Sequence, residues 1–342
     1  MQDRKKYLSS PEKTIEVGPK SVSALLDAMA ATGFQGKRLG EAARIWCEMV
    51  DQKNLTIFMG YSGSLSTTGQ WKIVRWLIEN RYIDVLVSTG ANISEDILEA
   101  MGYNYYQGSW LANDEDLLEN KIDRFYDIYA DEYDYRELEG LIRKFASTLS
   151  TKRAYSTREF LNRFGEYQWK KGIKSITATA WKHNVPIYSP GLIDSGYGVA
   201  LSLLMREEGK KIQLDQTQDM EELGQIADKT RTAVVFVGGG VPKDTIQLAT
   251  IIKSLSEGGE EATPHDYAIQ ITTDSPQWGG LSGCTLEEAI SWGKIASDST
   301  RSVVYCDATI ALPLISHAMG ERAKKRKAVP NLSWVFKGQG KD

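Results

Sequence analysis

The sequence is poor in the residues that metal sites and covalent cross-links require. It contains three cysteines and three histidines among 342 residues. Cys47, Cys284 and Cys306 show no metal-ligand spacing, and their odd number argues against a disulfide framework. The histidines show no HExxH or other paired spacing, which disfavours zinc chemistry and histidine-based triads. Because free cysteines are typical of a reducing compartment, we expect a cytoplasmic protein.

Long apolar runs and a strong net charge are also missing. No run of about 18 apolar residues occurs, and the N-terminal segment lacks the apolar centre of a secretion signal. We therefore expect no membrane span and no membrane partner. The formal net charge of −4 gives no basic footprint for DNA or RNA, so nucleic-acid binding is not expected. The basic run from Arg322 to Lys327 is interpreted as a solvated tail.

Short buried β runs alternate with helical segments along the chain, which is typical of a parallel sheet with crossover helices. The predicted helices include 21–32, 40–51, 71–80 and 94–101. The predicted strands are 55–60, 83–88, 185–189, 232–237, 267–271 and 302–305. The sequence therefore predicts an α/β fold with a parallel, Rossmann-like sheet flanked by helices. We expect an N-terminal extension (1–20), a single large domain (21–330) and a C-terminal tail (331–342).

At least five of the six predicted strands end in loops rich in Gly, Ser and Thr. Ligands of open parallel sheets bind beyond the carboxyl ends of the strands, and backbone N–H groups in such loops hold phosphates. A dinucleotide site is therefore a reasonable hypothesis. Because no GxGxxG occurs, ordinary turn chemistry remains an alternative explanation of these glycines.

The segment 102–175 is rich in aromatic and acidic residues, and we expect it to be mostly helical. Its tyrosines cluster between Asp123 and Tyr135. We interpret this cluster as a helical packing or subunit surface and not as a chemical site.

The segment from Thr285 to Asp307 has features that are typical of a functional site. Thr285 and Glu288 form a capping box that begins a short helix, which we expect to carry Ala289, Ile290 and Trp292 on its apolar side and to end near Gly293 and Lys294. A buried strand then leads to Cys306 and Asp307. A lysine at a helix end also complements the helix dipole, and a tryptophan there is usually core, so these features alone do not establish catalysis.

Six motifs of this sequence resemble the deoxyhypusine synthase family. They cover the chain from about residue 20 to residue 320, and SWGK after GGGVxK is the most specific combination. The motifs are GYSGSLSTTG (Gly60–Gly69), IDVLVSTGANISEDI (Ile83–Ile97), IYSPGLIDSGYG (Ile187–Gly198), VVFVGGGVPKDTI (Val234–Ile246), EEAISWGKI (Glu287–Ile295) and YCDATIALPL (Tyr305–Leu314).

The resemblance implies an NAD-dependent aminoalkyl transfer through an enzyme lysine. In the family, NAD takes hydride from spermidine, the lysine captures the imine, and the butyl group passes to an acceptor amine before reduction. The acceptor is a lysine of translation factor 5A, or putrescine in the related homospermidine synthases. A nucleophilic lysine must be partly neutral, which requires a desolvating or cationic environment.

The resemblance also implies roles for individual residues. Lys294 matches the imine-forming nucleophile. Trp292, Glu288 and Glu95 match residues that serve the amine, and the tryptophan can supply a desolvating wall. The positions that match NAD contacts are Ser64, Thr67, Thr89, Gly90, Ala91, Asp194, Gly238, Gly239, Ser282, Asp307 and Ala308. Asp194 and Asp307 are candidate partners of ribose hydroxyls, with a helix cap or turn as the alternative role.

The amine pocket departs from the family pattern. Asp244 replaces the histidine that follows GGGVxK, Leu248 replaces an asparagine, and Val199 replaces an acid. The segment 278–283 lacks two aspartates of the family loop. A buried ammonium without a partner costs several kcal/mol. The sequence therefore leaves open whether spermidine is the donor and whether the factor 5A lysine is the acceptor. Asp244 is retained as a candidate amine-binding residue.

Three classes of function follow. The first is aminoalkyl transfer, either to a protein lysine or between free amines such as putrescine and agmatine. The second is a non-catalytic member that binds NAD, which the lost histidine and acids favour and the intact SWGK opposes. The third is an NAD dehydrogenase without imine transfer. Since family members are tetramers with sites between subunits, we expect a homotetramer.

Overall fold

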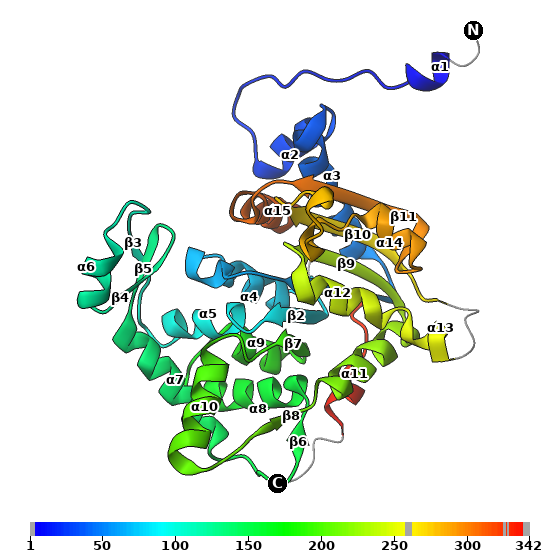
Figure 1. Ribbon diagram of the computed structural model, residues 1–342. Coiled ribbons are helices and arrows are strands. Elements are labelled where there is room, and N and C mark those ends of the chain that lie inside the picture. Colours follow the sequence, from blue (N-terminus) through cyan, green and yellow to red (C-terminus); the bar gives the residue numbers. More distant parts are fainter. Residues whose placement is uncertain (1–3, 257–261, 324–325, 327, 338–342) are drawn as a thin grey trace.

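The computed structural model describes residues 4–256, 262–323, 326 and 328–337, and its largest element is a six-stranded parallel sheet (Figure 1). The strand order is β11-β10-β9-β1-β2-β7. These strands are β1 (Leu55–Tyr61), β2 (Val85–Thr89), β7 (Ile187–Gly191), β9 (Arg231–Val237), β10 (His265–Thr272) and β11 (Ile295–Tyr305). The predicted α/β class and all six predicted strands are confirmed.

Helices cover both faces of the sheet. The helices are α1 (Arg4–Tyr7), α2 (Val22–Ala30), α3 (Phe34–Asp51), α4 (Trp71–Glu79), α5 (Asn92–Ala100), α6 (Asp114–Glu119), α7 (Glu132–Ala146), α8 (Thr157–Lys170), α9 (Ile176–His183), α10 (Gly196–Glu208), α11 (Gln216–Lys229), α12 (Gly240–Ala249), α13 (Ile252–Ser256), α14 (Leu286–Ser291) and α15 (Ala308–Arg322). Short 3₁₀ turns are η1 (Leu65–Thr68), η2 (Pro276–Trp278), η3 (Leu281–Gly283) and η4 (Ser333–Phe336).

The burial of the central strands on both sides explains why both faces of the sheet need a cover. Every residue of β1 is buried, as expected for a parallel strand between two helical layers. Successive side chains of β1 point to opposite faces, so Ile57 and Met59 join one hydrophobic cluster and Phe58 joins the other. Figure 1 shows α2, α3 and α15 together over the β10–β11 end, whereas α11 and α12 cover the opposite face.

The predicted helix over 123–135 is wrong. The structure has an antiparallel sheet here, with strand order β3-β5-β4 and bounds β3 (Tyr106–Gln107), β4 (Ile122–Phe125) and β5 (Ile128–Asp131). Tyr126 adopts a left-handed φ of 55° in the turn between β4 and β5, which ends any helical path. Aromatic and β-branched residues favour such a pleated surface, and helix α7 begins only at Glu132.

The interpretation of residues 322–327 as a solvated tail is wrong for the two arginines that the structure describes. Arg322 pairs with Asp27, and Arg326 is fully buried in an ion pair with Asp84, 2.6 Å between Nη1 and Oδ2. Lys324, Lys325 and Lys327 lie outside the described residues. A minor parallel pair, β6 (Ala154–Tyr155) with β8 (Gln213–Leu214), completes the described strands. Among the described residues, no helix is both long and apolar enough to cross a membrane.

The strand order reverses between β1 and β9. The chain passes from β1 to β2 on one side, whereas β9, β10 and β11 follow one another on the other side. β1 and β9 pair from Leu55–Arg231 to Tyr61–Val237, so they end at the same level of the sheet. In an open parallel sheet, such a reversal opens a crevice at the carboxyl ends of the two strands. The candidate site is therefore expected at the carboxyl ends of β1 and β9.

Candidate active site

A cavity of about 260 Å³ lies at the reversal of strand order. The loops that follow β1, β9, β10 and β11 all contribute to it. Five of the predicted cofactor residues line it together, namely Gly238, Gly239, Ser282, Asp307 and Ala308. Ser62, Gly63, Leu65 and Asp274 also line the cavity, although the sequence had not singled them out. The sequence could have indicated these residues, because each belongs to a loop that directly follows a predicted strand.

The glycine loop after β9 needs its glycines for close packing. Gly238 has a φ of 77°, which L-residues rarely adopt. A Cβ on Gly239 would lie 2.4 Å from the Cα of Ser282, which is a backbone atom of the opposing loop. The loop therefore presents bare backbone to the cavity just before α12 begins. Backbone amides at a helix start suit a phosphate, so these residues fit a dinucleotide.

The two carboxylate oxygens of Asp307 can serve different roles, one as a helix cap and one toward the cavity. Its Oδ1 accepts hydrogen bonds from the backbone N–H and the hydroxyl of Thr309, at 2.7 and 2.6 Å, and so caps α15. The helix-cap role that the sequence left open is therefore present. Oδ2 remains available toward the cavity, because a carboxylate accepts several hydrogen bonds.

A second group of predicted residues surrounds the carboxyl end of β2. It comprises Ser64, Thr67, Thr89, Gly90, Ala91 and Glu95. Asn92 ties this group to the loop after β1, because its Oδ1 accepts from the N–H of Leu65 at 2.7 Å. The hydroxyl of Thr89 likewise donates to the carbonyl of Gly63 at 2.8 Å. Since Gly63 and Leu65 line the cavity, this second group adjoins it.

Glu95 is the chemically unusual member of this group. Its carboxyl is buried, and Ser64 Oγ lies 2.8 and 2.7 Å from its two oxygens. Desolvation raises the pKa of Glu95 to about 7, against the lowering effect of the Ser64 hydrogen bond. The pKa of the adjacent, fully buried Asp96 is also raised to about 7, mainly by desolvation. Two neighbouring carboxyls that titrate near neutrality are typical of functional sites.

Lys294 is held by the end of α14. Thr285 caps the start of this helix, as the capping box predicted, by accepting from the N–H of Glu288 at 2.9 Å. At the other end, the N–H of Gly293 bonds to the carbonyl of Ile290, and that of Lys294 bonds to Ala289, at 3.0 and 3.1 Å. With Gly293 at a φ of 70°, this is a Schellman ending. It turns the chain into β11 and sets the position of Lys294.

The Lys294 side chain is buried next to one acid. Its Nζ lies 3.4 Å from Asp244 Oδ1 and 5.4 Å from the centre of the Trp292 ring. Trp292 is not on the apolar side of α14; it caps the helix and is 64% exposed. In this chain it therefore does not enclose the lysine as the expected wall would. Glu288 lies exposed on the same helix.

Lys243 is a further candidate functional residue. It belongs to the motif GGGVPK, from which we predicted no role for it. Its side chain is 1% exposed and donates to Gln270 Oε1 at 3.1 Å and to the carbonyl of Cys284. Burial lowers the pKa of Lys243, and the Lys294 charge adds to this effect. Gln270 in turn donates to the carbonyls of Gly238 and Ser282. These bonds connect the surroundings of Lys294 to the cavity loops.

The predicted residues do not form one compact site within a single chain. Glu95 follows β2 and Lys294 precedes β11, so four strand spacings, roughly 19 Å, separate their ends of the sheet (Figure 1). Asp194 follows β7 and is exposed, whereas Asp307 follows β11 at the opposite edge. Among the described residues, no hydrogen bond or ion pair joins Glu95 to Lys294.

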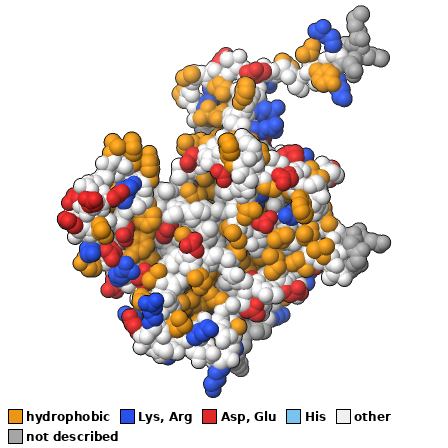
Figure 2. Space-filling model, viewed as in Figure 1, with side chains coloured by type: hydrophobic (Ala, Val, Ile, Leu, Met, Phe, Trp, Pro, Cys, Tyr) orange, Lys and Arg blue, Asp and Glu red, His pale blue; other side chains and the backbone are white. Residues whose placement is uncertain are grey.

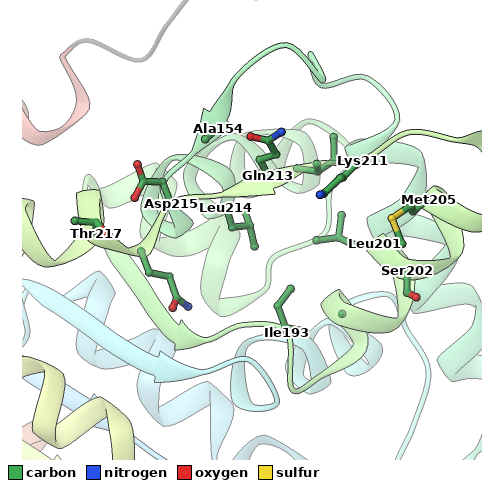
Figure 3. A pocket seen from close by; sticks show the side chains of 13 residues that line it. Ala154, Ile193, Leu201, Ser202, Met205, Lys211, Gln213, Leu214, Asp215 and Thr217 are labelled. Atoms are coloured by element: carbon green, nitrogen blue, oxygen red, sulfur yellow. The ribbon is translucent and has the colours of Figure 1, made fainter.

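A more voluminous cavity lies elsewhere. It measures about 850 Å³ and runs between α10 and the segment that contains β8. Figure 3 shows Ile193, Leu201, Met205 and Leu214 along it, with Lys211 and Asp215 as its charged groups. Asp215 is engaged, since it caps α11 by accepting from the N–H of Gln218. None of the predicted site residues lines this groove, so its volume does not mark the chemical site.

Comparisons of the sequence with known proteins agree on one family. The sequence model of deoxyhypusine synthase matches residues 24–319. The protein named "probable deoxyhypusine synthase 2" of Methanosarcina acetivorans is 46% identical over 332 residues, 96% of this chain and 95% of that protein. The protein of the same name from Archaeoglobus fulgidus is 46% identical over 299 residues, 87% and 98% of the two chains.

The fold has a solved counterpart. The crystal structure of a candidate deoxyhypusine synthase from Entamoeba histolytica superposes with a TM-score of 0.64 at 18% identity. The match covers 94% of this chain and 100% of that one. At 18% identity, the structural similarity supports only the fold, and the sequence matches establish the family.

Proposed function

The chain belongs to the deoxyhypusine synthase family, a family of transferases, and we propose that it is an NAD-dependent aminoalkyl transferase that carries the transferred group on Lys294. The observation that carries this proposal is the setting of Lys294. A Schellman turn holds the lysine, an acid contacts its amine, and a hydrogen-bonded path through Lys243 and Gln270 leads from its surroundings to the glycine loops.

We propose that NAD occupies the cavity at the strand reversal. The bare backbone at Gly238 and Gly239 and the start of α12 would hold phosphate, and Asp307 Oδ2 would accept from a ribose hydroxyl. The residues of the second group, including Ser64 and Glu95, adjoin the same cavity through Gly63. When bound, NAD supplies the hydride acceptor for amine oxidation.

A substitution tests the cofactor site. Gly239→Ala would place a methyl group 2.4 Å from the backbone of Ser282, so the two loops must separate. We expect NAD to bind at least tenfold more weakly, as measured by calorimetric titration. Gly191→Ala is the matched control, because it lies at the end of β7 in the same sheet and its Cβ would meet no atom within 4 Å. Unchanged NAD affinity in Gly239→Ala would contradict the placement of the cofactor.

The acids of the site support a cationic amine as substrate. Asp244 and Glu288 lie near Lys294, and Glu95 lies beside the cavity. At the position of a further family acid, however, Val199 presents an apolar and partly exposed side chain. We propose a polyamine or diamine donor, with either a free amine, as in homospermidine synthases, or a protein lysine of translation factor 5A as acceptor.

We propose that the active unit is a homotetramer in which sites are shared between subunits. The strand order supports sharing, because β2, which precedes Glu95, and β11, which follows Lys294, stand four positions apart in the sheet. The surface beside Lys294 supports it too. Figure 2 shows hydrophobic side chains over the region where α12 and α14 lie, and Val241, Leu281 and Trp292 are exposed there. Apolar patches of this kind on a soluble protein are typical of interfaces.

The direct test is incubation with NAD and spermidine, putrescine, agmatine or cadaverine, with products read by mass spectrometry. We expect one donor to give a transfer product with wild-type protein and none with Lys294→Ala. Adding factor 5A or a second free amine identifies the acceptor. NAD binding without a product from any amine would contradict the transferase proposal and favour a non-catalytic member.

A further inference from the structure

Asp244 is the acid in direct contact with the proposed nucleophile. We propose that Asp244 moves the proton during imine exchange at Lys294: its carboxylate accepts a proton from the lysine nitrogen and returns it to the departing amine. This inference deepens the proposed function and rests on it. It assigns to Asp244 a step in the chemistry, beyond the binding of substrate charge.

The position of Asp244 suits this role. It lies on the second turn of α12, and its Oδ1 is 3.4 Å from Lys294 Nζ. The Asp244 side chain is 36% exposed, whereas that of Lys294 is 11% exposed. Within the described part of the chain, Asp244 Oδ2 has no hydrogen-bond partner. One oxygen therefore faces the lysine, and the other is free to meet a second nitrogen that enters from the open side.

The neighbouring charged groups do not compete for this contact. Lys243 precedes Asp244 on α12, but its Nζ turns inward to Gln270 and the carbonyl of Cys284. Among the described residues, no carboxylate other than Asp244 forms an ion pair with Lys294. Glu288, on α14, forms a hydrogen bond with the side chain of Cys284 and adds its charge to this cluster. The geometry thus gives Lys294 a single adjacent proton acceptor.

The step balances without any further reagent. The neutral nitrogen of Lys294 attacks the carbon of a protonated imine, and a C–N bond forms. The lysine nitrogen now carries an extra proton, which Asp244 accepts. Asp244 then donates this proton to the original amine nitrogen as its C–N bond breaks. The products are a protonated imine on Lys294, a free amine and the original carboxylate, with no net oxidation.

The experiment separates amine oxidation from imine capture. Wild type, Asp244→Asn and Asp244→Glu would be mixed with NAD and the active donor in single-turnover reactions. NADH formation reports oxidation, and borohydride trapping followed by peptide mass spectrometry reports the adduct on Lys294. Glu287→Gln is the matched control, because it removes a neighbouring exposed acid that pairs with Arg301 and not with Lys294.

Asp244→Asn also removes a charge that can bind the amine, so the two losses are compared with each other. We expect the variant to lose adduct formation at least about 100-fold, the usual scale of acid–base assistance, and to lose NADH formation at least about tenfold less than that. Asp244→Glu keeps a carboxylate and should recover at least about tenfold over the asparagine variant. Glu287→Gln should resemble wild type in both measurements. Thermal unfolding of each variant checks that it is folded.

Two results would overturn the inference. Adduct formation at the wild-type rate in Asp244→Asn would show that the carboxylate moves no proton. Equal loss of NADH and adduct would show that Asp244 binds the amine and does not act in the exchange. Failure of the proposed function looks different, because wild type itself would then form neither NADH nor adduct with any amine, and both proposals would fall together.

Discussion

At the scale of the residue, Glu95 shows how burial prepares a carboxyl group for chemistry. The group is buried, and among the described residues no cation pairs with it. Its hydrogen bond with Ser64 offsets only part of the desolvation cost, so its pKa is raised to about 7. An uncharged carboxyl beside the proposed cofactor cavity can donate a hydrogen bond or take up charge when a cationic amine arrives.

The raised pKa predicts how stability depends on pH. Between pH 4.5, the ordinary value for this group, and about 7, folded Glu95 keeps a proton that the unfolded chain has released. The free energy of unfolding therefore falls as pH rises through this window. Glu95→Gln removes the effect, so the variant should melt at the wild-type temperature or below near pH 4.5 and above it at pH 8, while its activity is lost.

Calorimetry at several pH values would measure this difference. Glu79→Gln is a suitable control, because Glu79 forms an i,i+4 pair with Arg75 on the surface of α4. The control should show no comparable gain in melting temperature between pH 4.5 and pH 8. A gain for Glu95→Gln that does not grow with pH would contradict the raised pKa.

At the scale of the element, the end of α14 positions Lys294, the proposed nucleophile. The Schellman ending needs a left-handed residue, and Gly293 supplies it at a φ of 70°. The next residue is Lys294, so the backbone turn and the direction of the lysine are coupled. The same ending closes α8, where Gly172 has a φ of 81° and bonds back to Trp169.

This pair of turns gives a matched test. Gly293→Ala and Gly172→Ala should each cost about 1 kcal/mol in the free energy of unfolding, because both force a Cβ into the left-handed region. Only Gly293→Ala should slow formation of the borohydride-trapped adduct, by at least about tenfold, since it alone redirects Lys294. Denaturant unfolding and the trapping assay measure the two effects. Equal adduct rates in the two variants would contradict the coupling.

At the scale of the whole molecule, a buried ion pair joins the C-terminal segment to the amino-terminal ends of two interior strands of the sheet. Arg326 Nη1 lies 2.6 Å from Asp84 Oδ2, and the guanidinium also donates to the carbonyls of Arg81 and Leu55. The Asp84 carboxylate in turn accepts from the N–H of Ile57 at 2.9 Å. The C-terminal segment is thereby attached to the starts of β1 and β2.

Removal of one partner should be costly. Arg326→Met leaves the buried Asp84 charge with a weaker set of partners, and we expect a loss of about 3 kcal/mol in the free energy of unfolding. The double variant Arg326→Met/Asp84→Asn should recover part of this loss. Arg231→Met removes an exposed pair with Asp266 and should cost at most about 1 kcal/mol. Urea unfolding measures all three, and a loss no larger than that of Arg231→Met would contradict the prediction.

The assembly can be tested by mixing two inactive proteins. If a site takes Lys294 from one subunit and Glu95 from another, then Lys294→Ala and Glu95→Gln are each inactive alone. After joint dissociation and reassembly, mixed oligomers should contain some sites with both wild-type residues, so part of the transfer activity should return. Native mass spectrometry would verify that mixed oligomers form. Mixed oligomers without recovered activity would contradict shared sites.

The sequence predicted the sheet and most of its loops because their signals are local. Strands such as 232–237 are short apolar runs, and the glycines after them mark the turn that follows. The error at 123–135 has the same origin. Tyrosines spaced along a segment suit a helix face or a pleated strand equally, and only the left-handed Tyr126 and the pairing of β4 with β5 decided between them.

By itself, the sequence determined the α/β class, the capped start of α14, the glycine loops and the identity of the lysine in SWGK. Capping bonds and apolar periodicity act over a few residues, so they can be read along the chain. The tertiary structure alone decided which distant groups meet. Asp244 lies 50 residues from Lys294, and Arg326 lies 242 residues from Asp84. Such contacts depend on how the helices pack on the sheet, and this packing also separates Glu95 from Lys294.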